Sequence, residues 1–136
     1  MPLVSLFERL PLEEAMPRLV EGSLQPVTGP LAVLAEETAE GLPPAKQALV
    51  WLYIDDLERA HNLCQDDSSE MGSLLHAIVH RREGDFSNAR YWLMRAGSLA
   101  DEQSKSLVER VKATRGDEPE LLSRQREEWK RLWDRD

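Results

Sequence analysis

The stretch HAIVHRREGDFSNARYW, residues 76–92, decides the fold of this chain of 136 residues. It begins within an apolar segment of helical periodicity, which predicts a helix over 72–83. Gly84 is a typical helix stop, and Asp85 is a typical N-cap for a second helix over 86–96. The stretch therefore predicts two helices joined by a tight turn.

The same pattern occurs 29 residues earlier in the chain. The residues ALVW at 48–51 correspond to AIVH at 77–80, and DLERA at 56–60 corresponds to DFSNA at 85–89. Each unit reads as an apolar helix, an Asp-containing junction and a second helix with an alanine where the two helices approach closely. The pattern is similar to that of tetratricopeptide-type repeats, which are somewhat longer at ~34 residues per unit. We therefore expect two stacked helical hairpins.

The regions on either side of this core are also predicted to be helical. Seven of the eight prolines lie in residues 1–44 and restrict helices there to short segments. Residues 98–136 are densely charged, with apolar positions at helical spacing. We predict one all-α domain of six to eight helices, with a Pro-rich front at 1–44, a two-hairpin core at 45–97 and a charged tail at 98–136. The expected helices are 12–20 with a break at Pro17, 31–40, 45–54, 57–65, 72–83, 86–96, 101–114 and 120–133.

Composition excludes several classes of function. The formal net charge is −8, which disfavours a role in binding nucleic acid, where affinity comes mainly from Lys and Arg. No apolar run approaches the ~20 residues that a membrane helix needs, and no signal peptide is visible. The single cysteine, Cys64, excludes an internal disulfide and is expected to be buried and unreactive. We expect a cytoplasmic protein without membrane or nucleic-acid partners.

All three histidines lie in the central repeat. The sequence contains no standard catalytic or nucleotide-binding motif. His76, His80 and Glu83 fall on one helix face, and two imidazoles one turn apart with a carboxylate can bind a divalent metal ion. Glu58 and His61 form a Glu-x-x-His pair, as in di-iron helical bundles, but the second pair that such bundles need is absent. Alternatively, the histidines are partly exposed and hydrogen-bonded to neighbouring acids. No other cofactor is predicted.

Two consecutive arginines fall within the apolar arc of the helix over 72–83. A cation there must be paired or must extend its head group to water. One interpretation is that Arg81 and Arg82 pair with acids at the helix junctions and lock the hairpins together. The other is a pocket for an anionic ligand. The acids expected for pairing are Asp55, Asp56, Glu83 and Asp85, and the residues expected to share the pocket are His80, Asn88 and Tyr91.

The last predicted helix carries two tryptophans one turn apart. Trp129 and Trp133 form a large apolar patch unless the helix docks on its own domain. The pair is therefore either an internal anchor or a contact with a partner, including a second copy of this chain.

Residues 45–97 resemble a group of small bacterial and fungal proteins. These share the signature His-x-x-x-His-Arg-Arg-Glu-x-Asp-(aromatic)-x-Asn-x-x-Tyr-Trp, which this chain carries at 76–92, preceded by WLYIDD at 51–56. No activity is assigned to the group, so the resemblance implies a shared site without naming its chemistry.

Two classes of function follow from these observations. We favour a tetratricopeptide-like domain that binds a protein or peptide in an open groove, because no complete catalytic set is present. The alternative is a small-molecule- or anion-binding protein, or an enzyme, with a closed cavity lined by the polar cluster. No catalytic residue is assigned. The candidate binding residues are Asp56, His61, His76, His80, Arg81, Arg82, Glu83, Asp85, Asn88 and Tyr91.

Overall fold

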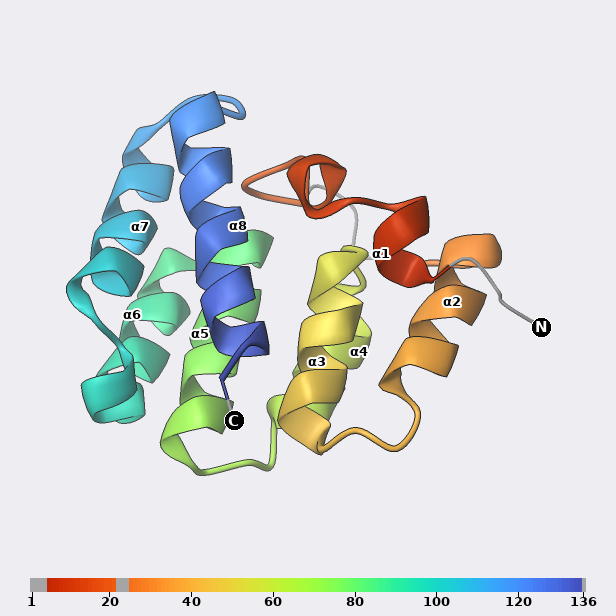
Figure 1. The fold of residues 1–136 in the computed structure, drawn as a ribbon. Coiled ribbons are helices and arrows are strands. Elements are labelled where there is room, and N and C mark those ends of the chain that lie inside the picture. Colours follow the sequence, from red (N-terminus) through yellow and green to blue (C-terminus); the bar gives the residue numbers. More distant parts are fainter. Residues whose placement is uncertain (1–4, 22–24, 136) are drawn as a thin grey trace.

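The computed structural model describes residues 5–21 and 25–135, and these ranges contain eight α-helices, two 3-10 helices and no strand. This confirms the predicted all-α class with six to eight helices (Figure 1). In chain order the elements are α1 (Leu6–Arg9), η1 (Leu12–Glu14), α2 (Pro30–Ala39), α3 (Pro44–Tyr53), α4 (Leu57–Cys64), α5 (Glu70–Glu83), α6 (Phe86–Ala96), η2 (Gly97–Leu99), α7 (Glu102–Ala113) and α8 (Pro119–Trp133).

The sequence repeat is also a structural repeat, because α3–α4 and α5–α6 are hairpins with equivalent turns. Asp55 and Gly84 occupy the same repeat position, and both have a left-handed backbone, with φ of 67° and 84°. The next residue in each turn is the N-cap of the following helix. The Asp56 and Asp85 carboxylates accept hydrogen bonds from the backbone N–H three residues later, at 3.1 and 3.2 Å. These caps satisfy donors that a helix start leaves without a partner.

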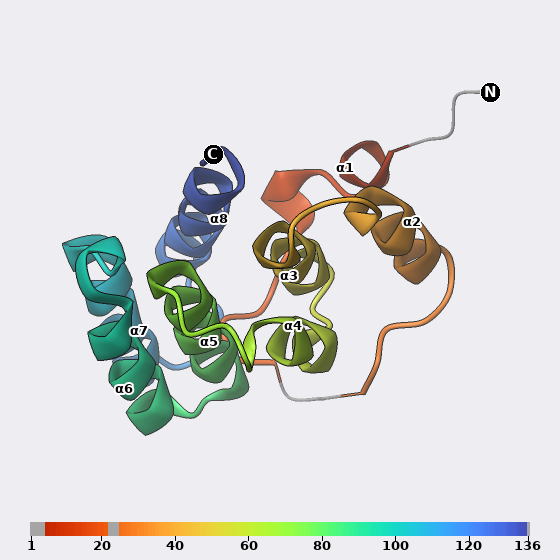
Figure 2. The ribbon, with the colours of Figure 1, turned by 90° about the horizontal axis from the view of Figure 1, so that it is seen from below.

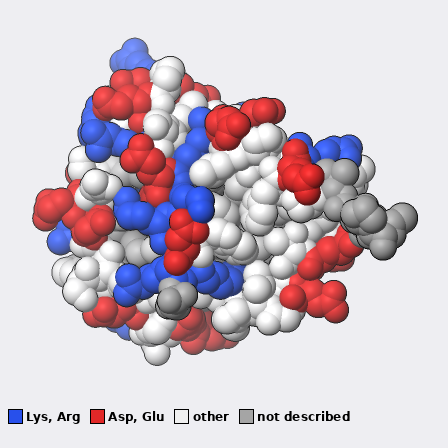
Figure 3. Space-filling model, in the orientation of Figure 1, with Lys and Arg blue, Asp and Glu red and all other residues white. Residues whose placement is uncertain are grey.

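Helix α5 is central to the fold. Helices α4 and α6 flank it, and α8 crosses its remaining face in contact with α3 and α7 (Figures 1 and 2). The indole N–H of Trp129 in α8 donates to the Leu49 carbonyl of α3 at 2.7 Å. The charged tail thus covers the α3–α5 face that an open helical groove would expose, and acidic and basic side chains are mixed over its outer surface (Figure 3).

The predicted helix over 12–20 is wrong beyond its first turn. Only η1 forms. The chain leaves helical geometry at Ala15, which is extended with ψ of 157°, and Met16 then has a left-handed φ of 50°. Pro17 disfavours helical geometry at the residue before it, and the freed carbonyls are satisfied by α8. The Gln125 amide of α8 donates to the carbonyls of Met16 and Arg18 at 3.2 and 3.1 Å.

The remaining helix boundaries lie close to the expected ones. Helix α5 begins at Glu70, two residues earlier than predicted, because the Ser69 hydroxyl caps it by accepting from the Gly72 N–H at 3.0 Å. None of the described helices combines the length and apolarity that crossing a bilayer requires.

Candidate functional site

Both arginines of the central signature form buried ion pairs. Arg82 is fully buried and donates to the Asp55 carboxylate at 2.6 Å and to the Leu52 carbonyl at 3.4 Å. Arg81 is equally buried and donates to Glu128 of α8 at 2.9 Å and to the Gln125 side-chain oxygen at 3.4 Å. Asp55 is one of the acids expected at the junctions, whereas Glu128 was not expected. The two pairs join the first hairpin and the tail to α5.

Burial makes the Arg82–Asp55 pair interdependent. Desolvation raises the pKa of the Asp55 carboxyl, and the adjacent Arg82 guanidinium opposes that rise. Desolvation likewise lowers the pKa of Arg82, and Asp55 opposes the fall. Each charge is therefore retained because of the other, and neither is available to a ligand.

The predicted anion pocket is not assembled, because its members have separate partners. Asn88 lies at an exposed turn, where its amide donates to the Asp85 carboxylate at 2.7 Å. Tyr91 is 47% exposed, and its hydroxyl accepts from Arg95 at 3.4 Å. Arg81, by contrast, is directed toward α8. The structure does not bring Arg81 together with Asn88 or Tyr91.

The three histidines do come together. His61 of α4 and His76 and His80 of α5 place one ligand atom each within 4.8 Å of one another. We call this group the trihistidine cluster. Glu83, which the sequence placed among the metal ligands, is not in the group and instead pairs with the Nδ1 atom of His80 at 3.0 Å. The predicted set is corrected accordingly: His61 replaces Glu83, because the hairpins bring α4 alongside α5.

The distances within the trihistidine cluster match those around a single metal ion. The Nε2 atoms of His61 and His76 are 3.1 Å apart. Two nitrogens bound tetrahedrally at 2.0–2.1 Å from an ion are separated by about 3.3 Å, and their ring centres by about 5 Å. The three pairs of ring centres are 4.7, 5.0 and 5.8 Å apart. The distances therefore suit one ion, but the rings of His76 and His80 are stacked with planes 15° apart, so one of them must rotate before the in-plane lone pairs of both point at it.

His76 is the buried member of the trihistidine cluster, and its ring stacks on Trp92 of α6 at 3.9 Å between centroids. Burial, followed by the proximity of His61 and His80, lowers the pKa of His76 to about 4. Its Nδ1 atom has no hydrogen-bond partner in the described part of the chain. At neutral pH His76 is thus a neutral imidazole, which is the form that binds metals.

Two other candidate residues have structural roles. Asp56 is 1% exposed, caps α4 and also accepts from the Val27 N–H at 3.2 Å. Cys64 is buried, and burial raises the pKa of its thiol to about 12. Because the thiolate is the nucleophile, Cys64 is unreactive at neutral pH, as expected.

The tryptophans of α8 differ in exposure. Trp129 is 4% exposed and stacks on Trp133 at 5.2 Å, within a group that also includes Phe7 and Tyr53. The burial of Trp129 fits the first of the two alternatives, an anchor that docks α8 on its own domain. Trp133 is only partly buried.

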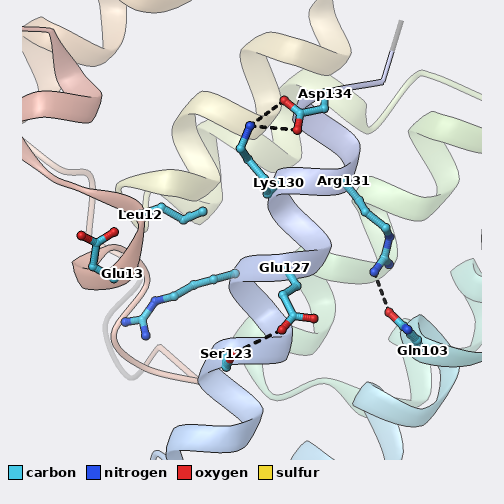
Figure 4. A pocket seen from close by; sticks show the side chains of 9 residues that line it. Leu12, Glu13, Gln103, Ser123, Glu127, Lys130, Arg131 and Asp134 are labelled. Atoms are coloured by element: carbon cyan, nitrogen blue, oxygen red, sulfur yellow. Dashed lines mark hydrogen bonds and ion pairs between the residues drawn. The ribbon is translucent and has the colours of Figure 1, made fainter.

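A depression of about 640 Å³ runs along α8, but most of its charged groups already have partners (Figure 4). Lys130 pairs with Asp134 at 2.7 Å, Arg131 donates to Gln103 at 2.7 Å, and Arg126 donates to the Ala15 carbonyl at 2.8 Å. It therefore presents few unpaired groups to a ligand, in contrast to the trihistidine cluster.

Comparison with known proteins assigns no activity. No protein-family model matches the chain, and neither the curated proteins nor the solved structures include a match. Functional inference for this protein therefore depends on the geometry of the trihistidine cluster.

Proposed function

We propose that this protein binds a divalent transition-metal ion, with His61, His76 and His80 as its ligands. The observation that carries the proposal is the convergence of three imidazoles from two helices to within 4.8 Å of one another. Imidazole nitrogen suits Zn²⁺, Cu²⁺, Ni²⁺ and Co²⁺, whereas Mg²⁺ and Ca²⁺ prefer oxygen ligands. The donor set therefore favours a transition metal such as zinc.

The outer shell of the cluster supports the same proposal. A metal-bound histidine usually places its second ring nitrogen against a carboxylate or a carbonyl. Glu83 contacts Nδ1 of His80 in this way and leaves Nε2 as the nitrogen available to the ion. The contact of Glu83 with His80 Nδ1 is therefore that of an orienting carboxylate and not that of a ligand.

The electrostatics of the cluster disfavour its protonation. Burial lowers the pKa of His76, and His61 and His80 lower it further because protonation would place like charges on adjacent rings. A bound cation would use the facing lone pairs of His61 and His76 without adding a proton.

The test is calorimetric titration of the metal-free protein, prepared without a histidine tag, with Zn²⁺. We expect one ion per chain. His61→Ala and His76→Ala should weaken binding by more than the roughly 100-fold that loss of an outer-shell partner can cost. Asn62→Ala, at an exposed position beside His61 on α4, is the matched control and should bind as the wild type does. Undiminished binding by His76→Ala would contradict the proposal.

A second candidate is the protein-interaction function favoured by the repeat pattern, here self-association through α6. It is supported by the exposure of two apolar side chains on that helix, Tyr91 at 47% and Met94 at 75%. Light scattering over a range of protein concentrations tests it. A dimer that dissociates in Met94→Glu is the expected result, and a monomer at every concentration would contradict it.

A further inference from the structure

We infer that the loaded trihistidine site keeps one coordination position open and binds water or a small monodentate anion there. This inference rests on the proposed metal-binding function. Zn²⁺ and Co²⁺ in such sites take at least four ligands, and the cluster supplies three. A structural zinc site is closed by four protein ligands, whereas a site with three leaves a position for solvent or substrate.

The two nearby groups that could supply a fourth ligand are engaged elsewhere. Glu83 is held against Nδ1 of His80 at 3.0 Å, on the side of the ring away from Nε2. The Cys64 Sγ atom lies 3.5 Å from the His61 carbonyl, toward which its S–H is directed, and it is outside the group of converging ligand atoms. Within residues 5–21 and 25–135, the fourth position is therefore left to an exogenous molecule.

The burial of the three rings shows where that molecule would enter. His76 is 6% exposed and stacked on Trp92, so it forms the closed side of the site. His61 and His80 are both partly exposed. An ion held by all three would have protein behind it and solvent in front, and its open position would face the solvent.

The charge of the site favours an anion in this position. Three neutral imidazoles leave the full double positive charge on the ion, whereas cysteinate ligands would neutralise it. The one carboxylate in contact with the cluster among the described residues, that of Glu83, offsets only one of these two charges. Such an ion also acidifies bound water, to a pKa of about 7 for zinc sites with three histidines. Hydroxide and small anions such as azide are therefore the expected ligands.

The experiment uses the full chain loaded with Co²⁺, whose visible absorption reports coordination directly. Titration with azide should change the spectrum with a saturable, single-site dependence. No change up to roughly 100 mM azide, which is well above a millimolar dissociation constant, would overturn the inference. Before azide is added, the cobalt spectrum of His61→Ala should already differ from that of the wild type.

Glu83→Gln separates an open site from one closed by Glu83. If Glu83 only orients His80, this variant should bind Co²⁺ about 10–100-fold more weakly and, once saturated, should still respond to azide. If Glu83 closes the site, the wild type should be silent and Glu83→Gln should respond, which would overturn the inference. Failure of the wild type to bind Co²⁺ would overturn the proposed function together with this inference. Binding without an azide response would overturn this inference alone.

Discussion

The ionisable residues on the two sides of helix α5 have different kinds of partner. Toward α3 and α8, Arg81 and Arg82 each contact a carboxylate from another element, Glu128 and Asp55, at 2.9 and 2.6 Å. Toward α4 and α6, His76 faces another imidazole, that of His61, at 3.1 Å between Nε2 atoms. The arginines thus join α5 to the first hairpin and to α8 through opposite charges, whereas the histidines form a cluster of like groups. Removing residues from each side should therefore have different effects.

Loss of the Arg82 ion pair should have the largest effect on stability. Arg82→Ala leaves Asp55 partly buried without its cation, and we expect the free energy of unfolding to fall by about 3–5 kcal/mol. Urea denaturation measures this. The double variant Arg82→Ala/Asp55→Asn should recover part of the loss, since asparagine removes the unpaired charge and tolerates the left-handed backbone at this position. Arg90→Ala, which breaks the exposed Arg90–Glu109 pair, is the control and should leave the urea midpoint almost unchanged.

Acidification tests the other side of α5. The pKa of His76 is lowered from 6.5 to about 4 in the folded state, so protonation favours the unfolded chain. The stabilising contribution is complete above pH 6.5 and is lost as the pH falls toward 4, by up to about 3 kcal/mol. His76→Phe, which keeps an aromatic ring against Trp92, should lose less stability over this interval. Urea denaturation measures the free energy of unfolding at each pH. An equal loss for the wild type and His76→Phe between pH 6.5 and 4 would contradict an uncharged His76.

Zinc should stabilise the folded protein by binding to the trihistidine cluster. At a free concentration of 100 times the dissociation constant, a ligand that binds only the folded state contributes about 2.7 kcal/mol. We expect Zn²⁺ to raise the melting temperature of the wild type, and we expect a chelator to restore the melting temperature of the metal-free protein. His80→Ala should show a much smaller shift. An equal shift in His80→Ala would indicate that the ion binds elsewhere.

The smallest expected effect concerns the two equivalent turns of the hairpins. Asp85→Ala removes an exposed N-cap and should cost about 1 kcal/mol. Asp56→Ala should cost more, because Asp56 is buried and also accepts from the Val27 N–H. Urea denaturation of both variants measures the difference. Equal losses would show that the added contact to Val27 has no energetic consequence.

Local sequence signals were sufficient for most of the helices. Gly84 adopts the left-handed conformation expected at a helix end, and Ser69 and Asp85 cap the helices that follow them. The segment over 12–20 could not be predicted in the same way. Its carbonyls are satisfied by the Gln125 side chain, which is more than 100 residues away in sequence.

The candidate site was predictable only within a single helix. His76 and His80 are four residues apart, and helical geometry places them on one face. The contribution of His61 depends on the packing of α4 against α5. Its Glu-x-x-His spacing with Glu58 indicated His61 as a candidate metal ligand, but it did not indicate which residues would join it. The pairing of Arg81 with Glu128 likewise requires α8 to lie across α5.

The sequence by itself therefore determined helices α2 to α8, the turns of the central hairpins and their duplication, because these depend on residues a few positions apart. Only the tertiary structure decided which ionisable groups meet. Consecutive helical residues point about 100° apart, so His80, Arg81 and Arg82 are directed to different neighbours. Which neighbours those are depends on how α4 and α8 pack, and that packing arises from apolar contacts distributed over the whole chain.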